Sequence, residues 1–393
     1  MPDAVIVSAC RTAIGTAFKG SLTETSAFDL ADAVVAESVA RSGIEPADFD
    51  DVILGESMYG GGVIARHAAL TTGLLNAPGQ AVNRHCASGL AAVSNAAAQI
   101  RTGMANAIIA GGVQSTSTMP RQSYRGLGTQ EWEEWWISPS HPDRPDAPNR
   151  DMSITVGWNA AQKVGVTREE MDEWALGSHR KAVAAIDEGR FADEIVPLKI
   201  TRADGSLTTF DTDEHPRRST SIEKLASLAP LHPEIEGFSI TAGNACGSND
   251  GAAALVLTSD TFATEQELTP LATIRSWTSV GVDPYETGLA PTIAIPKALE
   301  LAGLSLDDVA LFEINEAFAA QCVADIKVLG IDPEKVNVSG SGCSLGHPVG
   351  ASGARMLVTL VHDLRRRGGG IGVASMCAGG GMGAAVVIEV PAP

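Results

Sequence analysis

The sequence has 393 residues, 44% of them hydrophobic and 19% charged, and a formal net charge of −19. This composition is typical of a globular chain of two or three domains and excludes a largely disordered one. The acidic balance disfavours nucleic acid and anionic membranes as main partners, and no apolar run is long enough to span a bilayer. The chain enters a short apolar strand at residues 4–7 without a signal peptide, so we expect a cytoplasmic protein.

The six cysteines are spread along the chain, and none belongs to a C-x-x-C pair. A structural zinc site needs closer spacing, and a disulfide framework is typical of small secreted chains. The sequence therefore predicts reduced thiols and no metal site.

The N-terminal part of the chain alternates helical and strand patterns. A loop at 43–48 follows an alanine- and leucine-rich helical pattern, and an apolar strand comes next. Cys86 begins a helix of small residues over 87–101, and a strand over 107–110 is expected to end at Gly111-Gly112. This alternation predicts an α/β fold.

Residues 119–249 have a different character, with many charges and a Pro-rich stretch over 139–148. A segment of this length inside an α/β chain predicts an insertion or a lid. Its acidic run 131–136 contains three tryptophans, Trp132, Trp135 and Trp136. The run either lines an acyl pocket or serves in ordinary packing or a subunit contact, and we favour the second interpretation.

The C-terminal part repeats the pattern of the first. A loop at 303–308 and an apolar strand lead to Asn315-Glu316, and His347 precedes a helix expected over 350–367. A last strand at 371–376 ends at a run of glycines.

The N-terminal and C-terminal patterns place similar landmarks at corresponding positions. Cys86 aligns near His347, and Gly111-Gly112 aligns with Gly379-Gly380. Chance similarity is the alternative, but agreement at four separate landmarks predicts two copies of one α/β half. We therefore expect an N-terminal half over 1–118, completed by about 250–270, an inserted domain over 119–249, and a C-terminal half over 271–393.

Four motifs carry residues suited to catalysis. Cys86 stands at a helix N-terminus, which stabilises a thiolate, and His347 lies in a Gly-rich loop from which it can act as a base. Cys377 supplies a second thiol, and the amides of Gly379 and the next glycines suit an oxyanion. Asn315, at a strand-to-helix junction, can orient a water. Each motif alone also fits a structural role: a buried cysteine, a histidine bound to loop carbonyls, a Gly-rich turn or a capping asparagine.

Together and in this order, these motifs resemble those of the thiolase family. Four further stretches are similar to the family as well, namely 7–15, 189–195, 213–217 and 241–254. The resemblance covers nearly the whole chain. It implies a five-layer α/β/α/β/α fold of two similar halves, with an inserted loop domain that binds coenzyme A (CoA).

The resemblance also implies an activity. Thiolases are CoA-dependent acyltransferases that cleave or form β-ketoacyl thioesters, so acyl-CoA and CoA are the expected partners. CoA is then a co-substrate, no cofactor is tightly bound, and the chain is a homodimer or homotetramer.

Roles follow from the resemblance residue by residue. Cys86 matches the nucleophile, His347 the base that activates it, and Cys377 the acid/base at the acetyl carbon. Asn315 matches the residue that holds a water in a first oxyanion hole beside His347. The amides of Cys86 and Gly379 match a second oxyanion hole. Four further residues match positions near the bound CoA or the acyl group: Arg217, Cys246, Met152 and Phe318.

The chain departs from the family pattern at 151–153, Cys246 and Trp158, all near this pocket, which leaves the acyl group open. Three other classes are alternatives. A β-ketoacyl synthase-like condensing enzyme shares the fold and the cysteine but lacks the Cys377 motif. A non-catalytic acyl-CoA carrier would bind ligand without becoming acylated. A dehydrogenase needs a G-x-G-x-x-G after the first strand, where this chain has Ser-Ala-Cys-Arg-Thr.

Overall fold

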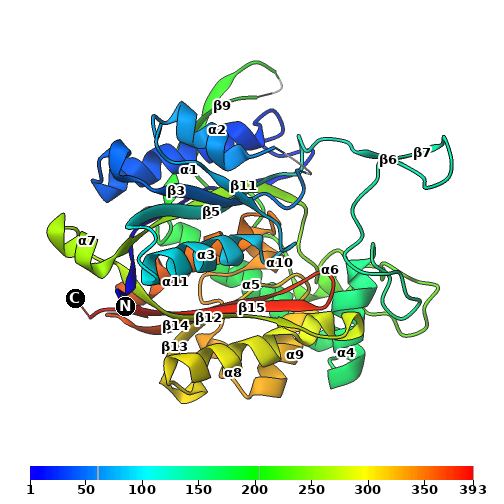
Figure 1. Ribbon diagram of the computed structural model, residues 1–393. Helices are drawn as coiled ribbons and strands as arrows, with labels where there is room; N and C mark the ends of the chain where they lie inside the picture. The colour runs from blue at the N-terminus through cyan, green and yellow to red at the C-terminus, as the bar shows by residue number, and fades with distance from the viewer. Residues whose placement is uncertain (60–61, 203, 393) are drawn as a thin grey trace.

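The structure, a computed structural model, describes residues 1–59, 62–202 and 204–392. Its elements are arranged in five layers, α/β/α/β/α, as Figure 1 shows. The layers begin with helices α1 (Ala27–Ser42) and α2 (Ile64–Thr71), continue through the first half-sheet to the central helices α3 (Ser88–Arg101) and α11 (Ser352–Arg366), and end beyond the second half-sheet with α8 (Pro291–Ala302) and α9 (Ala319–Leu329). The predicted fold class is confirmed.

Within the described residues, eleven strands form one mixed sheet. Its main order is β13 (Val309–Ile314), β14 (Gly370–Ala378), β15 (Met382–Val390), β12 (Ala272–Gly281), β1 (Ala4–Thr12), β11 (Asn249–Ser259), β5 (Ala107–Ser115), β3 (Asp51–Gly55) and β4 (Gln80–Val82). Two short strands lie off this path, β2 (Gly15–Thr16) against β11 and β8 (Ile195–Val196) against β1. The two half-sheets meet only where residues 4–6 of β1 pair with residues 272–274 of β12.

Both half-sheets have the same strand order and directions. In the first, β3 is parallel to β5, and the ladder continues antiparallel through β11 to β1. In the second, β13 is parallel to β14, and the ladder continues antiparallel through β15 to β12. A single parallel bridge between Phe312 and Val336 takes the place of the β3–β4 pairing. The predicted duplication is therefore confirmed.

The expected alignment of Gly111-Gly112 with Gly379-Gly380 is wrong. β5 continues through both glycines to Ser115, whereas Gly379 follows the end of β14. A Cβ on Gly112 would collide with the carbonyl oxygen of Gly350, just before α11. Gly112 therefore lets the central helix layer approach the strand, whereas a Cβ on Gly111 would collide with the Ala253 carbonyl oxygen of the neighbouring strand β11, and neither glycine ends β5.

The central layer depends on small side chains. α3 has alanine or glycine at six of its fourteen positions, and a Cβ on Gly89 would lie 2.6 Å from the backbone nitrogen of Ala354 in α11. The two helices can therefore pack with their backbones close together. Their apolar faces share one core cluster with the inner faces of both half-sheets.

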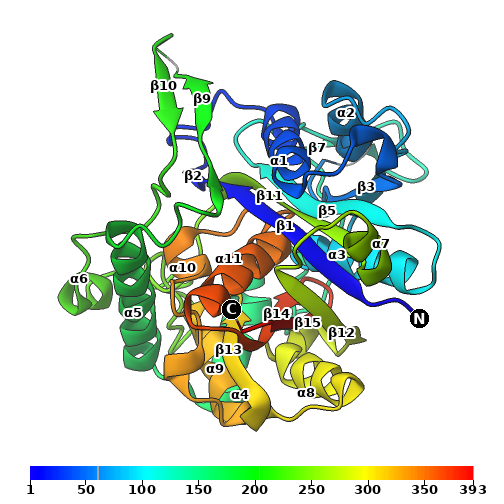
Figure 2. The same ribbon diagram turned by 90° about the vertical axis from the view of Figure 1, so that its left-hand side faces the viewer.

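The connection between β5 and β11 holds the predicted insertion. Its regular elements are β6 (Ser123–Arg125), β7 (Trp132–Glu134), the π-helical turn η2 (Ser153–Trp158), α4 (Asn159–Val164), α5 (Arg168–Asp187), β9 (Leu198–Thr201), β10 (Leu207–Phe210) and α6 (Ile222–Ala226). A capping box between Thr167 and Glu170 fixes the start of α5. The β6–β7 hairpin extends away from the body in Figure 1, and the β9–β10 hairpin does so in Figure 2.

The remaining elements are short: α7 (Asp260–Glu265), α10 (Gly342–Leu345) and the 3₁₀ turns η1 (Pro46–Asp48), η3 (Pro284–Leu289), η4 (Leu306–Asp308) and η5 (Pro333–Lys335). Across the described ranges, the helices are all too short or too polar to cross a membrane.

Candidate active site

Cys86 lies in the loop between β4 and α3, two residues before the helix begins. Its neighbour His85 has φ +45°, a left-handed conformation that is uncommon outside glycine and that concentrates at functional sites. Ser88 holds this conformation, because its Oγ accepts from the Arg84 amide at 2.8 Å and donates to the His85 carbonyl at 2.6 Å. The thiol is therefore presented on a fixed, partly exposed turn at the entry of the helix.

The turn between β14 and β15 contacts this thiol from the second half of the chain. The backbone N–H of Gly379 donates to the Cys86 sulfur, which favours the thiolate, as does the amide of Cys86 itself. Burial outweighs both donors and raises the pKa of Cys86 above its usual value. The backbone amides expected from the sequence are present, but the resting residue is a thiol.

Two further thiols lie near Cys86. Cys377, at the end of β14, is buried, and burial raises its pKa well above the usual value, with Cys86 and then Asp325 as smaller causes. Burial also raises the pKa of Cys246 to about 12, again with Cys86 as the next cause. Cys246 donates its backbone N–H to the Ala317 carbonyl at 3.0 Å, which attaches its loop to the segment before α9.

His347 is oriented as a base. Its backbone N–H donates to Asn249 Oδ1 at 3.0 Å, and its ring Nδ1 lies 2.6 Å from Ser352 Oγ. The Ser352 hydroxyl donates to the Pro348 carbonyl, so it accepts from Nδ1–H and leaves the lone pair on Nε2. Burial, and then the charge of Arg355, lower the pKa of His347 to about 4, which keeps the ring neutral at pH 7.

Nε2 of His347 and both amide atoms of Asn315 are buried, and in the part of the chain that the structure describes they have no hydrogen-bond partner. Buried polar atoms normally have one, so these atoms are suited to a substrate oxygen or a water. Val349, two residues after His347, lines the same cavity as Cys86 and Gly379.

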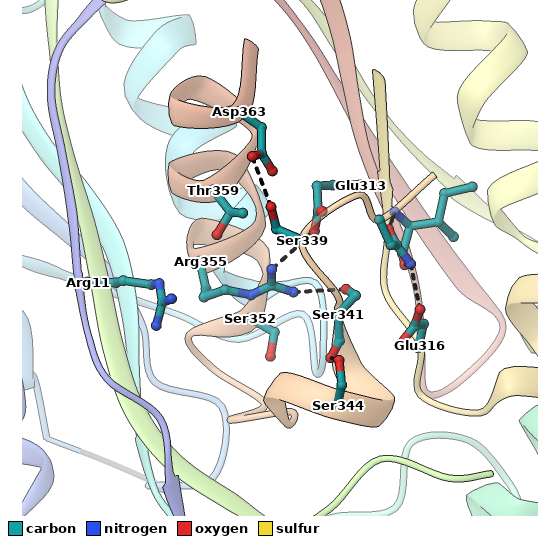
Figure 3. Close-up of polar contacts among 12 residues, drawn as sticks. Arg11, Glu313, Glu316, Ser339, Ser341, Ser344, Ser352, Arg355, Thr359 and Asp363 are labelled. Atoms are coloured by element: carbon teal, nitrogen blue, oxygen red, sulfur yellow. Dashed lines mark hydrogen bonds and ion pairs between the residues drawn. The ribbon is translucent and has the colours of Figure 1, made fainter. Parts of the chain in front are cut away.

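A buried polar network holds the His347 loop, as Figure 3 shows. Arg355 on α11 donates to Glu313 Oε2 at 3.1 Å and to Ser341 Oγ at 3.0 Å. Farther along α11, Asp363 accepts from Ser339 at 2.9 Å. Burial raises the pKa of Glu313 to about 8, although Arg355 opposes this shift. This network was not predicted from the sequence, where its one signal was the spacing of Arg355 and Asp363 among the apolar residues of α11 that the structure buries.

The expected CoA contacts lie along one route. Ala245 and Phe318 form a bridge beside Cys246, and Met152 Sδ would lie 3.7 Å from a Cβ on Gly379. The route continues to Gly247, where a Cβ would collide with the ring of His215. Arg217 lies two residues after His215, at the surface, and its backbone N–H donates to His179 Nδ1 at 3.1 Å. The structure thus brings Met152, Cys246 and Phe318 near the thiols and places Arg217 at the outer end.

Two positions that depart from the family pattern meet in one cluster. Asp151 Oδ2 lies 2.8 Å from His232 Nε2, and the His232 ring packs edge-on against Phe238 at 4.9 Å between ring centroids. Trp158 contacts the same Phe238 at 5.1 Å. Asp151 and Trp158 therefore both contribute to the packing of one wall of the insertion.

A cavity of about 300 Å³ adjoins Cys86. Trp136 lines it, whereas Trp132 and Trp135 are 59% and 57% exposed. Trp136 is half-buried and stacks on Tyr124 as well as lining the cavity, so the choice between an acyl-pocket role and ordinary packing or a subunit contact stays a prediction. No group of three potential metal ligands occurs among the described side chains.

Comparisons with known proteins agree with this geometry. Residues 4–261 match the family described as Thiolase, N-terminal domain, and residues 268–390 match Thiolase, C-terminal domain. An acetyl-CoA acetyltransferase of Escherichia coli K12 is 44% identical, with 99% of each chain covered. Solved structures of a Bacillus anthracis acetyl-CoA acetyltransferase (43% identity, TM-score 0.93) and of human mitochondrial 3-ketoacyl-CoA thiolase (36%, TM-score 0.91) each align over 99% of both chains. The chain belongs to the thiolase family.

Proposed function

We propose that this enzyme cleaves 3-ketoacyl-CoA with CoA to acetyl-CoA and a shortened acyl-CoA, and also runs the reverse Claisen condensation, through an acyl-enzyme on Cys86. One observation carries the proposal. Two thiols, Cys86 and Cys377, meet from opposite halves of the chain, with the Gly379 amide donating to the first. The full-length relatives named acetyl-CoA acetyltransferase and 3-ketoacyl-CoA thiolase support the same activity.

The first half of the reaction breaks a carbon–carbon bond. Nε2 of His347 removes the proton from Cys86, and the sulfur attacks the 3-keto carbon. The bond between carbons 2 and 3 breaks, and its electron pair remains on the departing acetyl-CoA enolate. Cys377 gives that carbon its proton. Because the high pKa of Cys377 keeps it protonated at pH 7, it is ready to act as an acid.

The second half restores the enzyme. Free CoA loses its thiol proton to the Cys377 thiolate and attacks the acyl group on Cys86, which leaves as a thiolate and takes the proton held by His347. The two oxyanions need separate donors. The amides of Cys86 and Gly379 serve one, and Asn315 with His347 serves the other through a water, each donor contributing about 3 kcal/mol to the lowering of the barrier.

The remaining proposals concern the setting of this chemistry. The domain boundaries are 1–118 with 250–270, 119–249 and 271–393, and the insertion carries most of the CoA contacts, with Arg217 at the nucleotide end. The chain works in the cytoplasm as a homodimer or homotetramer, in fatty acid metabolism such as β-oxidation. Its six unpaired cysteines agree with a reducing compartment.

A condensing enzyme of the β-ketoacyl synthase type is not favoured, because both halves of the chain match thiolase domains. Loss of β-ketothioester absorbance from acetoacetyl-CoA tests the proposal. Turnover that requires free CoA and disappears in Cys86→Ala, but persists in the matched thiol variant Cys246→Ser, supports thiolysis. Turnover that requires an acyl carrier protein instead of CoA contradicts it.

A further inference from the structure

The cavity beside Cys86 is mostly apolar. Its walls include Met58, Met119, Pro120, Trp136, Ile137 and Val349. Its volume of about 300 Å³ is roughly ten times the ~30 Å³ share of one water molecule in the liquid. The methyl end of an acetoacetyl group is about the size of one water, so most of this space is not needed for acetoacetyl-CoA.

The residues that line the cavity are mostly different from the residues expected to contact CoA. Of the four expected CoA contacts, only Met152 also lines the cavity among the described side chains. Cys246, Phe318 and Arg217 lie along the other route. A 3-ketoacyl-CoA carries CoA on one side of its keto carbon and the acyl chain on the other. With CoA on the first route and the keto carbon at Cys86, the acyl chain lies in the cavity.

We propose that the preferred substrates are 3-ketoacyl-CoA thioesters whose apolar acyl chain is several carbons longer than that of acetoacetyl-CoA, with Trp136 as the residue that sets the preference. This inference rests on the proposed thiolase function and names its substrate class. The relatives named acetyl-CoA acetyltransferase transfer an acetyl group to acetyl-CoA by name, which is the four-carbon case, so the longer-chain preference is proposed from the cavity of this chain.

Trp136 is a well-held wall. Its backbone N–H donates to the Gln122 carbonyl at 2.8 Å, and its ring stacks on Tyr124 with centroids 5.0 Å apart and an interplanar angle of 18°. A fixed aromatic wall can contribute dispersion and apolar burial along a chain that passes over it. Trp132, in the same hairpin, is 59% exposed and lies outside the cavity lining, so it offers a matched control.

The test is the kcat/KM for thiolysis of 3-ketobutanoyl-, 3-ketohexanoyl-, 3-ketooctanoyl- and 3-ketodecanoyl-CoA. Each methylene in an apolar pocket contributes on the order of tenfold, so the wild-type value should rise by up to about 10⁴-fold over the four methylenes between four and eight carbons, and a rise below about tenfold would contradict the inference. Trp136→Ala should remove most of that rise. Trp132→Ala should behave as wild type.

A second variant changes the cavity without removing Trp136, whose loss could also disturb the β6–β7 hairpin. Met119→Trp should narrow the cavity and shift the preference toward the four-carbon substrate while the Trp136–Tyr124 stack stays in place. A wild-type preference for acetoacetyl-CoA would overturn the inference, as would equal effects of Trp136→Ala and Trp132→Ala on all lengths. In both cases CoA-dependent turnover of acetoacetyl-CoA persists, whereas failure of the proposed function removes turnover at every length.

Discussion

The two halves of the chain share one topology but differ at one connection. Between β14 and β15 the chain turns in three residues, Gly379–Gly381, whereas the equivalent connection from β5 to β11 contains the whole of 116–248. Both connections lie near Cys86: the short one supplies an amide, and the long one supplies Trp136 and Met152 to the cavity. The duplicated core thus positions Cys86, Cys377 and His347, while the insertion supplies part of the cavity wall beside Cys86.

The two central helices, α3 and α11, also differ between the halves. α3 is built of small, mainly apolar side chains and begins just after Cys86. α11 carries Arg355 and Asp363, which hold the His347 loop through Glu313 and Ser339. One copy therefore presents a thiol on a close-packed helix, and the other holds a base with a buried polar network.

The largest expected effect tests the division of labour between the two thiols. Cys377→Ala should lower the rate of thiolysis by on the order of 10³-fold, because it removes the acid at the departing carbon. Acyl transfer from a simple acyl-CoA to Cys86 should fall much less, because that step breaks no carbon–carbon bond and needs Cys377 only to protonate the departing CoA thiolate. Rapid-quench measurement of both steps checks this, and equal loss of both would give Cys377 a structural role.

A second prediction concerns the attachment of the insertion to the first half. Arg11, on β1, pairs with Asp213 at 2.8 Å and with Glu194 at 2.6 Å, and all three side chains are buried. Arg11→Ala leaves two buried carboxylates without their partner, so the free energy of unfolding should fall by about 3–5 kcal/mol. Urea unfolding measures this change. The exposed pair Arg218–Asp187 is the control, and Arg218→Ala should change stability far less, because solvent screens an exposed ion pair.

The third prediction compares buried histidines. Burial is the main cause that lowers the pKa of His215 in the insertion, and of His347 in the second half, from 6.5 to about 4. Between these pH values the unfolded chain binds protons that the folded chain does not, so stability falls as the pH drops from about 6.5 to 4. His215→Gln should reduce this loss by up to about 3 kcal/mol.

Unfolding free energies at pH 7 and at pH 4.5 measure that effect. His179 has a pKa lowered to about 4 as well, so His215→Gln should reduce the dependence and leave part of it in place. An unchanged slope in the variant would contradict the burial of His215 as a neutral side chain.

The smallest expected effect concerns the turn Gly379–Gly381 between β14 and β15. Gly380 has φ +91°, and a Cβ there would lie 2.6 Å from the Ser140 carbonyl oxygen, whereas a Cβ on Gly379 would meet only ordinary contacts. Gly380→Ala should lower stability by about 1–3 kcal/mol, and Gly379→Ala by much less. Thermal unfolding of both variants distinguishes them, and equal losses would contradict the turn geometry.

Much of the core was predictable because its signals are local. Helical and strand periodicity and the repeated landmarks predicted two copies of an α/β half. The resemblance to the thiolase family implied the five-layer arrangement and the placement of Cys86, Cys377 and Gly379 in one site. The glycines 111–112 misled the analysis because a strand followed by glycines looks like a strand that ends. Tertiary contacts explain them: Gly112 lies against the segment before α11, and Gly111 lies against the backbone of β11.

Contacts between distant segments were not predictable. Arg11 finds its partners 183 and 202 residues away, and the periodicity of a single sequence does not pair such positions. The tryptophan run at 131–136 was visible in the sequence. Which of its rings lines the cavity beside Cys86 depends on the local backbone, including φ +61° at Trp135. The roles of the predicted residues, Asn315 and the CoA contacts included, remain predictions for experiment.

The central claim is that Cys86 carries the acyl group between the two halves of the reaction. The most direct test is peptide mass spectrometry after brief acid quenching of the enzyme with a 3-ketoacyl-CoA in the absence of free CoA. We predict an acyl adduct on the peptide that contains Cys86, discharged by added CoA and absent in Cys86→Ala. Turnover without that adduct, or a CoA-dischargeable adduct on Cys246 or Cys377 instead, would contradict the account.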